Sequence, residues 1–242
     1  MDVEELIERE SIQEDWTILD IVKKHPPSGW KDLFSEELYQ NYQDVDEFLS
    51  DKKFYPLKKN LFRALEITSL KMVKVVIIGM DPYYTNSMID NVETPTGQGL
   101  CFSVHKKDKI PPSLNNIFKE MIDTKVIDKF PEHGDLTRWA MQGCLLLNAC
   151  LTVFPGSSGN NKKIWEFFVK KVITLINENN PKTVFILWGN KAKELSKYIS
   201  DSNIIIEGAH PSPLSAKFFF GGDYFNKTNS YLKKYNKKEI KW

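Results

Sequence analysis

The stretch VKVVIIGMDPYY, residues 73–84, decides the architecture of this chain. Residues 73–78 form a mostly β-branched apolar run that is too short for a helix and therefore predicts a buried strand. The Asp-Pro pair that follows favours a turn directly after the strand. Three further runs of the same kind lie at residues 144–147, 184–188 and 204–206. The four runs together predict a buried β-sheet.

Helical patterns lie between these runs. We expect helices over 114–122 with Ser113 as N-cap, over 135–142 with Asp135 as cap, over 165–179 and over 191–199. Strands that alternate with helices need crossover connections, which favour parallel strand pairing. The predicted fold is therefore α/β, a three-layer α/β/α sandwich with a central four-stranded, mainly parallel sheet.

Polar residues follow the carboxyl ends of the predicted strands. Asp81 comes after the first run, Asn148 ends the second, Gly189-Asn190 follows the third, and His210 follows the fourth. Ligands of open parallel sheets bind beyond these strand ends. We therefore expect Asp81, Asn148 and His210 to converge on one crevice.

Composition and charge indicate one globular domain with an acidic start. The chain has 242 residues, of which 41% are hydrophobic and 27% charged. Residues 1–50 hold 14 acidic and 4 basic side chains, a net charge of −10, and the other residues have a net charge of +11. A basic body suits a polyanion such as nucleic acid, although a lysine-rich solvated surface explains the charge equally well. We divide the chain into an acidic, partly helical extension (1–29, helix expected over 3–24) and a catalytic domain (30–242).

Several classes of site are absent from the sequence. There is no phosphate loop, no serine-hydrolase elbow and no dinucleotide fingerprint. The four histidines lack metal-ligand spacing, and three cysteines without a CxxC pair argue against disulfides and structural zinc. No apolar run reaches the roughly 18 residues of a membrane span, and the acidic N-terminus lacks a secretory pattern. We expect an intracellular protein, not secreted and not at a membrane, with no metal and no cofactor.

Residues 79–84 (GMDPYY), 210–215 (HPSPLS) and 143–153 (GCLLLNACLTV) together resemble motifs of the family 1 uracil-DNA glycosylases. Residues 79–84 (GMDPYY) are similar to the family's water-activating motif Gly-Gln-Asp-Pro-Tyr-His, and residues 210–215 (HPSPLS) match its loop of the same sequence in full. Further similarities are residues 143–153 (GCLLLNACLTV), 99–104 (GLCFSV), 111–114 (PPSL), 187–189 (LWG) and 219–221 (FFG), all in family order. The resemblance extends from about residue 30 to residue 242.

The resemblance implies a monofunctional glycosylase that hydrolyses the N-glycosidic bond without a covalent lysine intermediate. Asp81 would position the attacking water, and a neutral His210 would donate a hydrogen bond to uracil O2. Asn148 would read the O4 and N3–H edge of uracil, and Tyr83 would exclude the methyl group of thymine. The uracil-binding set also contains Phe102, which would stack on the base, and the backbone N–H of Met80.

Flipping of the base implies further contacts with DNA. Leu214 would enter the minor groove as a wedge. The implied DNA-binding set also contains Pro211 and three serines, Ser113, Ser212 and Ser215, whose hydroxyl and backbone N–H groups would hold phosphates.

The chain departs from the family pattern at several places. Met80 replaces Gln, Tyr84 replaces His, and the 84–97 stretch is longer by roughly eight residues, enough for an ordinary short loop. Residues 154–163 (FPGSSGNNKK) lack the family's histidine-bearing motif. These departures keep open a rival reading, a DNA-binding scaffold or processivity subunit with weak or no catalysis. An adenine-methylating enzyme is remote, because the required glycine-rich nucleotide loop is missing.

The sequence thus predicts a base excision repair enzyme that releases uracil from single- and double-stranded DNA and leaves an abasic site. We expect a monomer that acts wherever the DNA is, in a nucleus, a bacterial-type cytoplasm or a viral replication site. Residues 1–29 could shield the basic face, recruit a replication or repair protein, or form a solvated helix, which is the simplest expectation.

Overall fold

The central sheet has the predicted strands. The computed structural model describes residues 11–157, 161 and 163–242. Its main sheet contains β1 (Val75–Gly79), β4 (Cys144–Asn148), β5 (Val184–Trp188) and β6 (Ile204–Gly208). The strands are all parallel in the order β4-β1-β5-β6, so the carboxyl ends of β1 and β4 meet where Gly79 pairs with Asn148. The predicted α/β fold with a four-stranded parallel sheet is confirmed.

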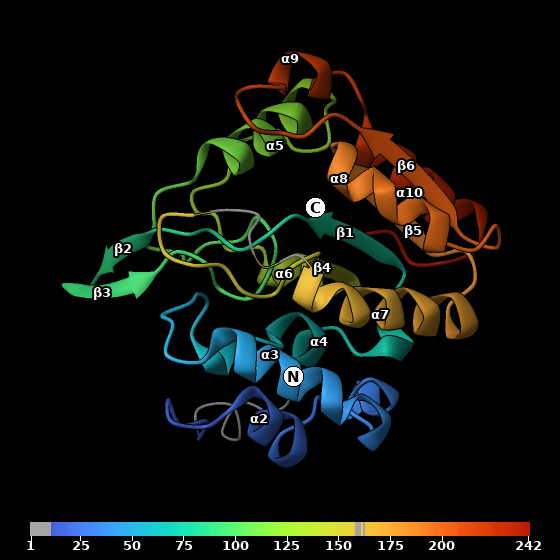
Figure 1. Ribbon diagram of the computed structural model, residues 1–242. Helices are drawn as coiled ribbons and strands as arrows, with labels where there is room; N and C mark the ends of the chain where they lie inside the picture. Colours follow the sequence, from blue (N-terminus) through green and yellow to red (C-terminus); the bar gives the residue numbers. More distant parts are fainter. Residues whose placement is uncertain (1–10, 158–160, 162) are drawn as a thin grey trace.

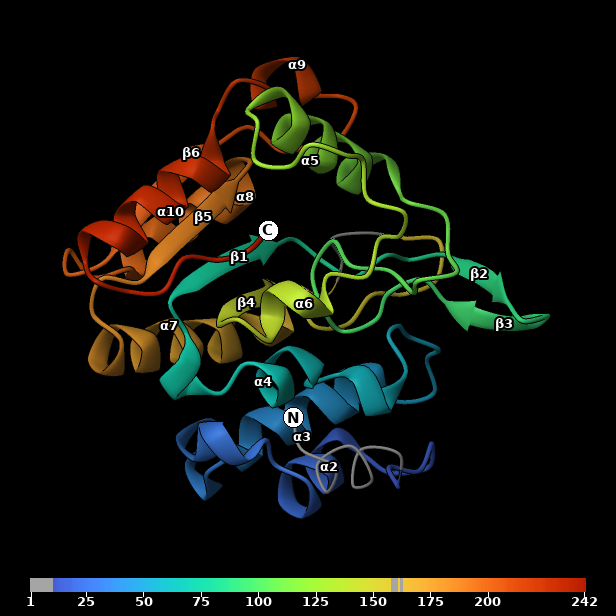
Figure 2. The same cartoon turned by 180° about the vertical axis from the view of Figure 1, so that it is seen from behind.

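Helices flank this sheet on both faces. Figures 1 and 2 show α7 and α8 on one face and α6 and α10 on the other. The helices of this part are α5 (Pro112–Asp123), α6 (Thr137–Ala140), η5 (Lys163–Trp165), α7 (Glu166–Asn179), α8 (Asn190–Lys193), η6 (Glu194–Tyr198), α9 (Ala216–Phe219) and α10 (Tyr224–Lys234). Apolar side chains from strands and helices form one continuous buried core.

Two helix starts differ from the sequence prediction. Helix α5 begins at Pro112 with Pro111 as N-cap, so Ser113 lies inside the first turn and does not cap the helix. Proline suits this position because its fixed φ matches the helix and its missing N–H would have no partner there. The N-cap of α6 is Leu136, although Asp135 still accepts the backbone N–H of Thr137 at 2.9 Å.

The stretch expected as a short loop at residues 84–97 instead forms a hairpin of β2 (Asn86–Ile89) and β3 (Val92–Pro95). Asp90 and Asn91 both have positive φ, as a tight two-residue turn between strands requires. Lys107 pairs with Asp90 at 2.5 Å, and Ser87 donates to Asp108 at 2.6 Å. The inserted residues thus form a separate sheet that is tied to the segment before α5.

Residues 18–72 form a helical layer under the sheet (Figure 1). It consists of α2 (Ile18–Lys24), η1 (Ser28–Leu33), η2 (Glu36–Leu38), α3 (Tyr39–Leu49), η3 (Lys58–Asn60), α4 (Arg63–Ile67) and η4 (Leu70–Met72). The helix expected over 3–24 is found only from Ile18 onward, and residues 3–10 lie outside the described part of the chain.

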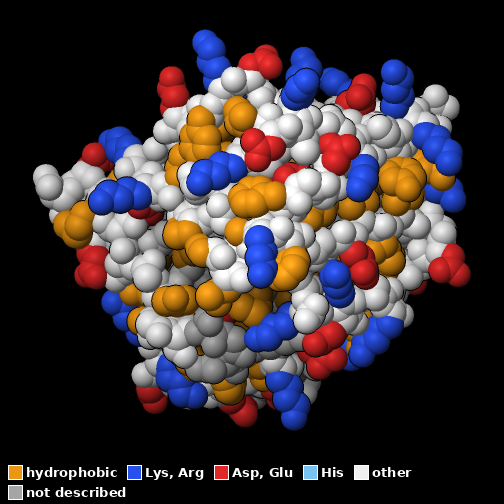
Figure 3. Space-filling view, turned by 90° about the horizontal axis from the view of Figure 1, so that it is seen from above, with side chains coloured by type: hydrophobic (Ala, Val, Ile, Leu, Met, Phe, Trp, Pro, Cys, Tyr) orange, Lys and Arg blue, Asp and Glu red, His pale blue; other side chains and the backbone are white. Residues whose placement is uncertain are grey.

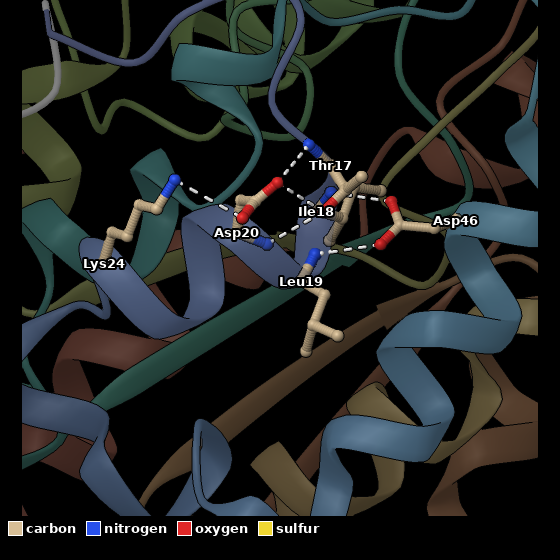
Figure 4. A network of polar contacts seen from close by, with 6 residues as sticks. All are labelled: Thr17, Ile18, Leu19, Asp20, Lys24 and Asp46. Atoms are coloured by element: carbon tan, nitrogen blue, oxygen red, sulfur yellow. Dashed lines mark hydrogen bonds and ion pairs between the residues drawn. The ribbon is translucent and has the colours of Figure 1, made fainter.

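Polar contacts fix the start of α2 to the domain. Thr17 and Asp20 form a reciprocal capping box, and Asp46 of α3 accepts the N–H groups of Ile18 at 2.6 Å and Leu19 at 3.0 Å (Figure 4). Burial raises the pKa of Asp46, although these two hydrogen bonds oppose the shift. The helix therefore starts where a carboxylate of the domain satisfies its free N–H groups.

Helix α2 is not wholly solvated. Ile18, Ile21 and Val22 are each 1% exposed and belong to the same apolar core as the strands. Burying such side chains is worth about 1.5–3 kcal/mol each. Within residues 11–157, 161 and 163–242, no helix has the length and apolar character needed to cross a membrane.

Candidate active site

A pocket of about 380 Å³ opens at the carboxyl ends of β1 and β4 and beside the segment that follows β6. Its wall is formed by segments 79–85, 96–100 and 111–113, together with Phe102, Asn148, His210 and Pro213. The polar residues expected to converge from three strands, Asp81, Asn148 and His210, all line this one pocket. Parallel pairing brings them together because all strands end at the same edge of the sheet.

The turn after β1 approaches β4 so closely that only glycine fits at its start. A Cβ on Gly79 would lie 2.4 Å from Oδ1 of Asn148 and 2.8 Å from Cβ of Cys101. The backbone is fixed on the same side, because the N–H of Cys150 donates to the carbonyl of Met80 at 3.0 Å. Met80 and Asp81 are half-buried in this turn, and Asn148 is only 6% exposed. The carboxamide of Asn148 is thus held at the base of the pocket.

The backbone of Phe102 itself has a strained conformation. Its φ is +61°, in the left-handed region that residues other than glycine seldom adopt. Flanking bonds hold this conformation, since the N–H of Cys101 donates to the Leu146 carbonyl at 3.1 Å and that of Val104 to the Gly134 carbonyl at 3.0 Å. Such strain persists only where its surroundings impose it and is common at functional sites.

The ring of Phe102 is supported from the end of β5 and faces the loop after β6. Its centroid lies 5.7 Å from that of Trp188 in an edge contact and 6.0 Å from that of His210. Tyr83 completes this wall, because its hydroxyl donates to the Phe102 carbonyl at 3.2 Å. Burial raises the pKa of Tyr83, so its hydroxyl stays protonated and able to donate at neutral pH. Sequence reasoning quoted Trp188 within residues 187–189 but gave it no role in the site, although its place at the end of an apolar strand was a usable signal.

His210 is held as a neutral imidazole of one defined tautomer. The N–H of Ser212 donates to Nδ1 of His210 at 3.0 Å, so Nδ1 is the acceptor and a neutral ring carries its proton on Nε2. Burial lowers the pKa of His210, which favours the neutral form. Gly189, with φ +86°, allows the close approach of β5, because a Cβ there would lie 3.0 Å from Cβ of His210.

The loop that follows His210 is braced from within and from α5. Ser215 Oγ donates to the His210 carbonyl at 2.8 Å and lies 3.2 Å from Ser212 Oγ. Pro211 is buried, and its carbonyl accepts a 2.8 Å hydrogen bond from the buried side chain of Asn116. Asn116 was missed from the sequence, although a polar residue among the apolar positions of a helix is a signal. Leu214, at the tip of the loop, is 96% exposed.

Two further observations concern the thiol beside the pocket and the metal-ligating side chains of the described residues. Burial, with the Asp81 charge as a smaller cause, raises the pKa of Cys150 to about 12, so this thiol is not ionised at neutral pH. Among the described residues, no group of three or more His, Cys, Asp or Glu side chains is arranged to hold a metal ion. The part of the sequence compared with the family's histidine motif, 154–163, falls partly outside the described residues at 158–160 and 162.

Comparison with known proteins settles the family. Residues 67–233 match the model of the Uracil DNA glycosylase superfamily, which is more than half of the chain. The chain belongs to this superfamily. A uracil-DNA glycosylase of Alkaliphilus oremlandii is 43% identical over 223 residues, which cover 89% of this chain and 95% of that protein. One of Deinococcus radiodurans is 39% identical over 231 residues, which cover 92% and 90%.

A solved structure agrees with the sequence relatives. The crystal structure of mimivirus uracil-DNA glycosylase matches with a TM-score of 0.83 at 28% identity, covering 93% of this chain and 88% of that chain. This superfamily member is accordingly a DNA repair enzyme, a hydrolase of N-glycosyl bonds that excises uracil and acts on DNA. The relatives favour the enzyme over the scaffold reading.

Proposed function

We propose that the 380 Å³ pocket receives uracil flipped out of DNA and that Asp81 and His210 cleave its glycosidic bond. The observation that carries this proposal is the convergence of Asp81, Asn148 and His210 on one pocket. They stand at the ends of three different strands, 67 and 62 residues apart in sequence. Parallel pairing of the strands brings these three side chains together at one edge of the sheet, although they lie far apart in the sequence.

The proposed chemistry separates charge. Breaking the bond by dissociation leaves a cationic sugar and an anionic base, and the enzyme must stabilise both. Asp81 supplies negative charge beside the sugar and orients the attacking water. His210 donates its Nε2–H to the developing charge on uracil O2, a role that the Ser212 contact at Nδ1 supports. Loss of one such donor in a dry pocket costs about 2.7–4 kcal/mol of transition-state stabilisation.

Base selection rests on the remaining walls. Asn148 offers one acceptor and two donors, which match the O4 and N3–H edge of uracil and mismatch cytosine. Tyr83 occupies the space beside C5 and thereby rejects the methyl group of thymine. Phe102 stacks on the base, and Met80 contributes its backbone N–H, because its thioether side chain cannot replace the amide of Gln.

The DNA strand runs over the loops around the pocket mouth. Leu214 fills the space that the uracil leaves, and its 96% exposure suits a residue that contacts only DNA. Ser113, Ser212 and Ser215 border the pocket or its loop and bind phosphates, and Pro211, which has no N–H group to donate, keeps this loop in shape through its fixed backbone angle. The hydroxyls of Ser212 and Ser215 already brace the loop, which supports phosphate binding through backbone N–H groups at these positions.

We also propose that residues 30–242 carry catalysis in a monomer and that the acidic residues 1–29 face a replication or repair protein. The support is their charge, which contrasts with the basic body. Deleting 1–29 removes Ile18, Ile21 and Val22 from the core, so a lower thermal stability with uracil excision retained is the expected result. Loss of excision in a folded deletion variant would contradict this division.

The proposed roles are tested by release of uracil from a single-stranded oligonucleotide in EDTA. Asp81→Asn and Asn148→Ala should each lose about 10²–10⁴-fold in rate. Asp201→Asn, an exposed aspartate outside the pocket, is the matched control and should leave the rate unchanged. Near-normal rates in folded Asp81→Asn or Asn148→Ala would show that the pocket residues are assigned wrongly.

A further inference from the structure

One feature of α9 is not used by the roles proposed above. Phe218 is 69% exposed, and it lies four residues after Leu214, which is 96% exposed. Leu214 lies in the turn before α9, and Phe218 lies within this helix (Ala216–Phe219), where its backbone N–H donates to the Ser215 carbonyl at 3.0 Å. Two large exposed apolar side chains therefore lie where the loop beside the pocket leads into α9.

The next residue explains why Phe218 has to point outward. Phe219 is fully buried and packs edge-on against Trp188 at 5.3 Å and stacks on Tyr224 at 4.9 Å. This anchor fixes the rotation of the turn, so the ring of Phe218 cannot reach the core. An exposed Phe forgoes the burial that stabilises most aromatic side chains, and adjacent exposed apolar residues mark interaction surfaces.

The positive charge beside Phe218 and its position near the pocket favour contact with DNA. The Lys217 ammonium lies 4.7 Å from the centroid of the Phe218 ring, a cation–π contact that also places a positive charge next to the ring. Figure 3, which looks onto the face that carries α9, shows hydrophobic side chains interspersed with Lys and Arg, with Asp and Glu side chains also present. Pro213 of the same turn lines the pocket, so a strand whose base enters the pocket must pass over this turn.

We propose that Phe218 is a second wedge residue, which stacks on the face of a base that becomes exposed when the uracil leaves the helix. This inference rests on the proposed role of the pocket and of Leu214. Leu214 has a branched aliphatic side chain, which can fill the vacated space but offers no flat face. A planar ring four residues further along the chain supplies the stacking surface that the remaining bases lose on flipping.

The test compares uracil release from duplex and from single-stranded DNA. Phe218→Ala should lower kcat/KM on a duplex by roughly 5- to 150-fold, the range that base–aromatic stacking spans, with a several-fold smaller loss on a single strand. Phe218→Tyr should keep the duplex activity, whereas Phe218→Leu should behave like Ala because it keeps apolar area without a ring. Phe130→Ala, an equally simple change at a Phe that is 43% exposed away from the pocket, is the matched control and should equal wild type.

A fluorescent purine analogue beside the uracil reports stacking directly. Wild type and Phe218→Tyr should quench it on binding a duplex, whereas Phe218→Ala and Phe218→Leu should leave it bright. The proposal is overturned if Phe218→Ala matches wild type on duplex DNA, loses equally on both substrates, or is rescued by Leu. The first of these outcomes would leave a protein partner as the occupant of this turn. Uracil release by Asp81→Asn from single-stranded DNA tests the role of the pocket separately. A failure of the pocket assignment is therefore distinguished from a failure of the proposal for Phe218.

Discussion

Replacing Gly79 by Ala tests how Asn148 is positioned. The new Cβ would lie 2.4 Å from Oδ1 of Asn148, whereas ordinary contact begins at 3.4 Å, so the carboxamide must move by about 1 Å. A displacement of 1 Å at a group that orients substrate can lower the rate about 10²-fold. The same Cβ also meets Cys101 at 2.8 Å, and overpacking of this kind lowers the free energy of unfolding by about 1–3 kcal/mol.

Single-turnover uracil release and thermal unfolding separate these two effects. Gly29→Ala is the matched control, because its Cβ would lie 2.6 Å from Cβ of Ser69, outside the residues that line the pocket. It should lower stability and leave the uracil excision rate unchanged. In Gly79→Ala the rate should fall about 10²-fold at temperatures where the protein is fully folded.

A double variant locates the cause. Gly79→Ala with Asn148→Ala removes the clash with the carboxamide, so it should recover part of the lost stability but none of the activity. A folded Gly79→Ala protein that excises uracil within roughly twofold of wild type would refute the reasoning. Asn148 would then tolerate displacement, and its proposed role in reading the base would be wrong.

Three further predictions concern other parts of the site. Tyr83→Ala should let thymine enter the pocket, so thymine release from DNA becomes measurable, and a variant that removes uracil but still ignores thymine contradicts the role of Tyr83. Because burial lowers the pKa of His210 below its ordinary 6.5 and the neutral ring is the active form, excision measured from about pH 5 to about pH 8 should decline only below pH 6.5. The unfolded ring takes up its proton at higher pH than the folded one, so the free energy of unfolding should fall over the same acid range, and a decline centred above 6.5 would exclude this assignment. Glu120, fully buried on α5, accepts the N–H groups of Gly221 and Asp223 at 2.8 Å each. In Glu120→Gln the side-chain NH2 group faces one of these two N–H donors, which should lower the free energy of unfolding by about 1–3 kcal/mol in denaturant titration. An unchanged unfolding midpoint would show that the contact contributes nothing to stability.

Patterns along the chain were enough to predict the elements that depend on neighbouring residues alone. The four apolar runs predicted β1, β4, β5 and β6 because buried parallel strands are continuous hydrophobic stretches. The tight Asp-Pro turn and the HPSPLS loop carried the family resemblance, which the superfamily match confirmed. The convergence of Asp81, Asn148 and His210 was also predictable, since parallel strands all end at one edge of the sheet.

Local reasoning failed where the outcome depended on residues distant in sequence. Of the helix expected over 3–24, the described residues show a helix at Ile18–Lys24, and Asp46 of another helix accepts the first N–H groups of this helix. The residues expected as an ordinary loop between Tyr84 and Gly97 form a hairpin, tied by Lys107 and Asp108 of a later segment.

The fold class, the family and the strand ends that carry the site were thus determined by the sequence alone, because burial pattern and motif order are local properties. Only the tertiary structure decided the closeness of Gly79 to Asn148, the left-handed backbone of Phe102 and the outward direction of Phe218. Each of these depends on contacts between segments that meet only after folding. Steric fit and hydrogen-bond geometry are set by distances in space, and no pattern along the chain records them.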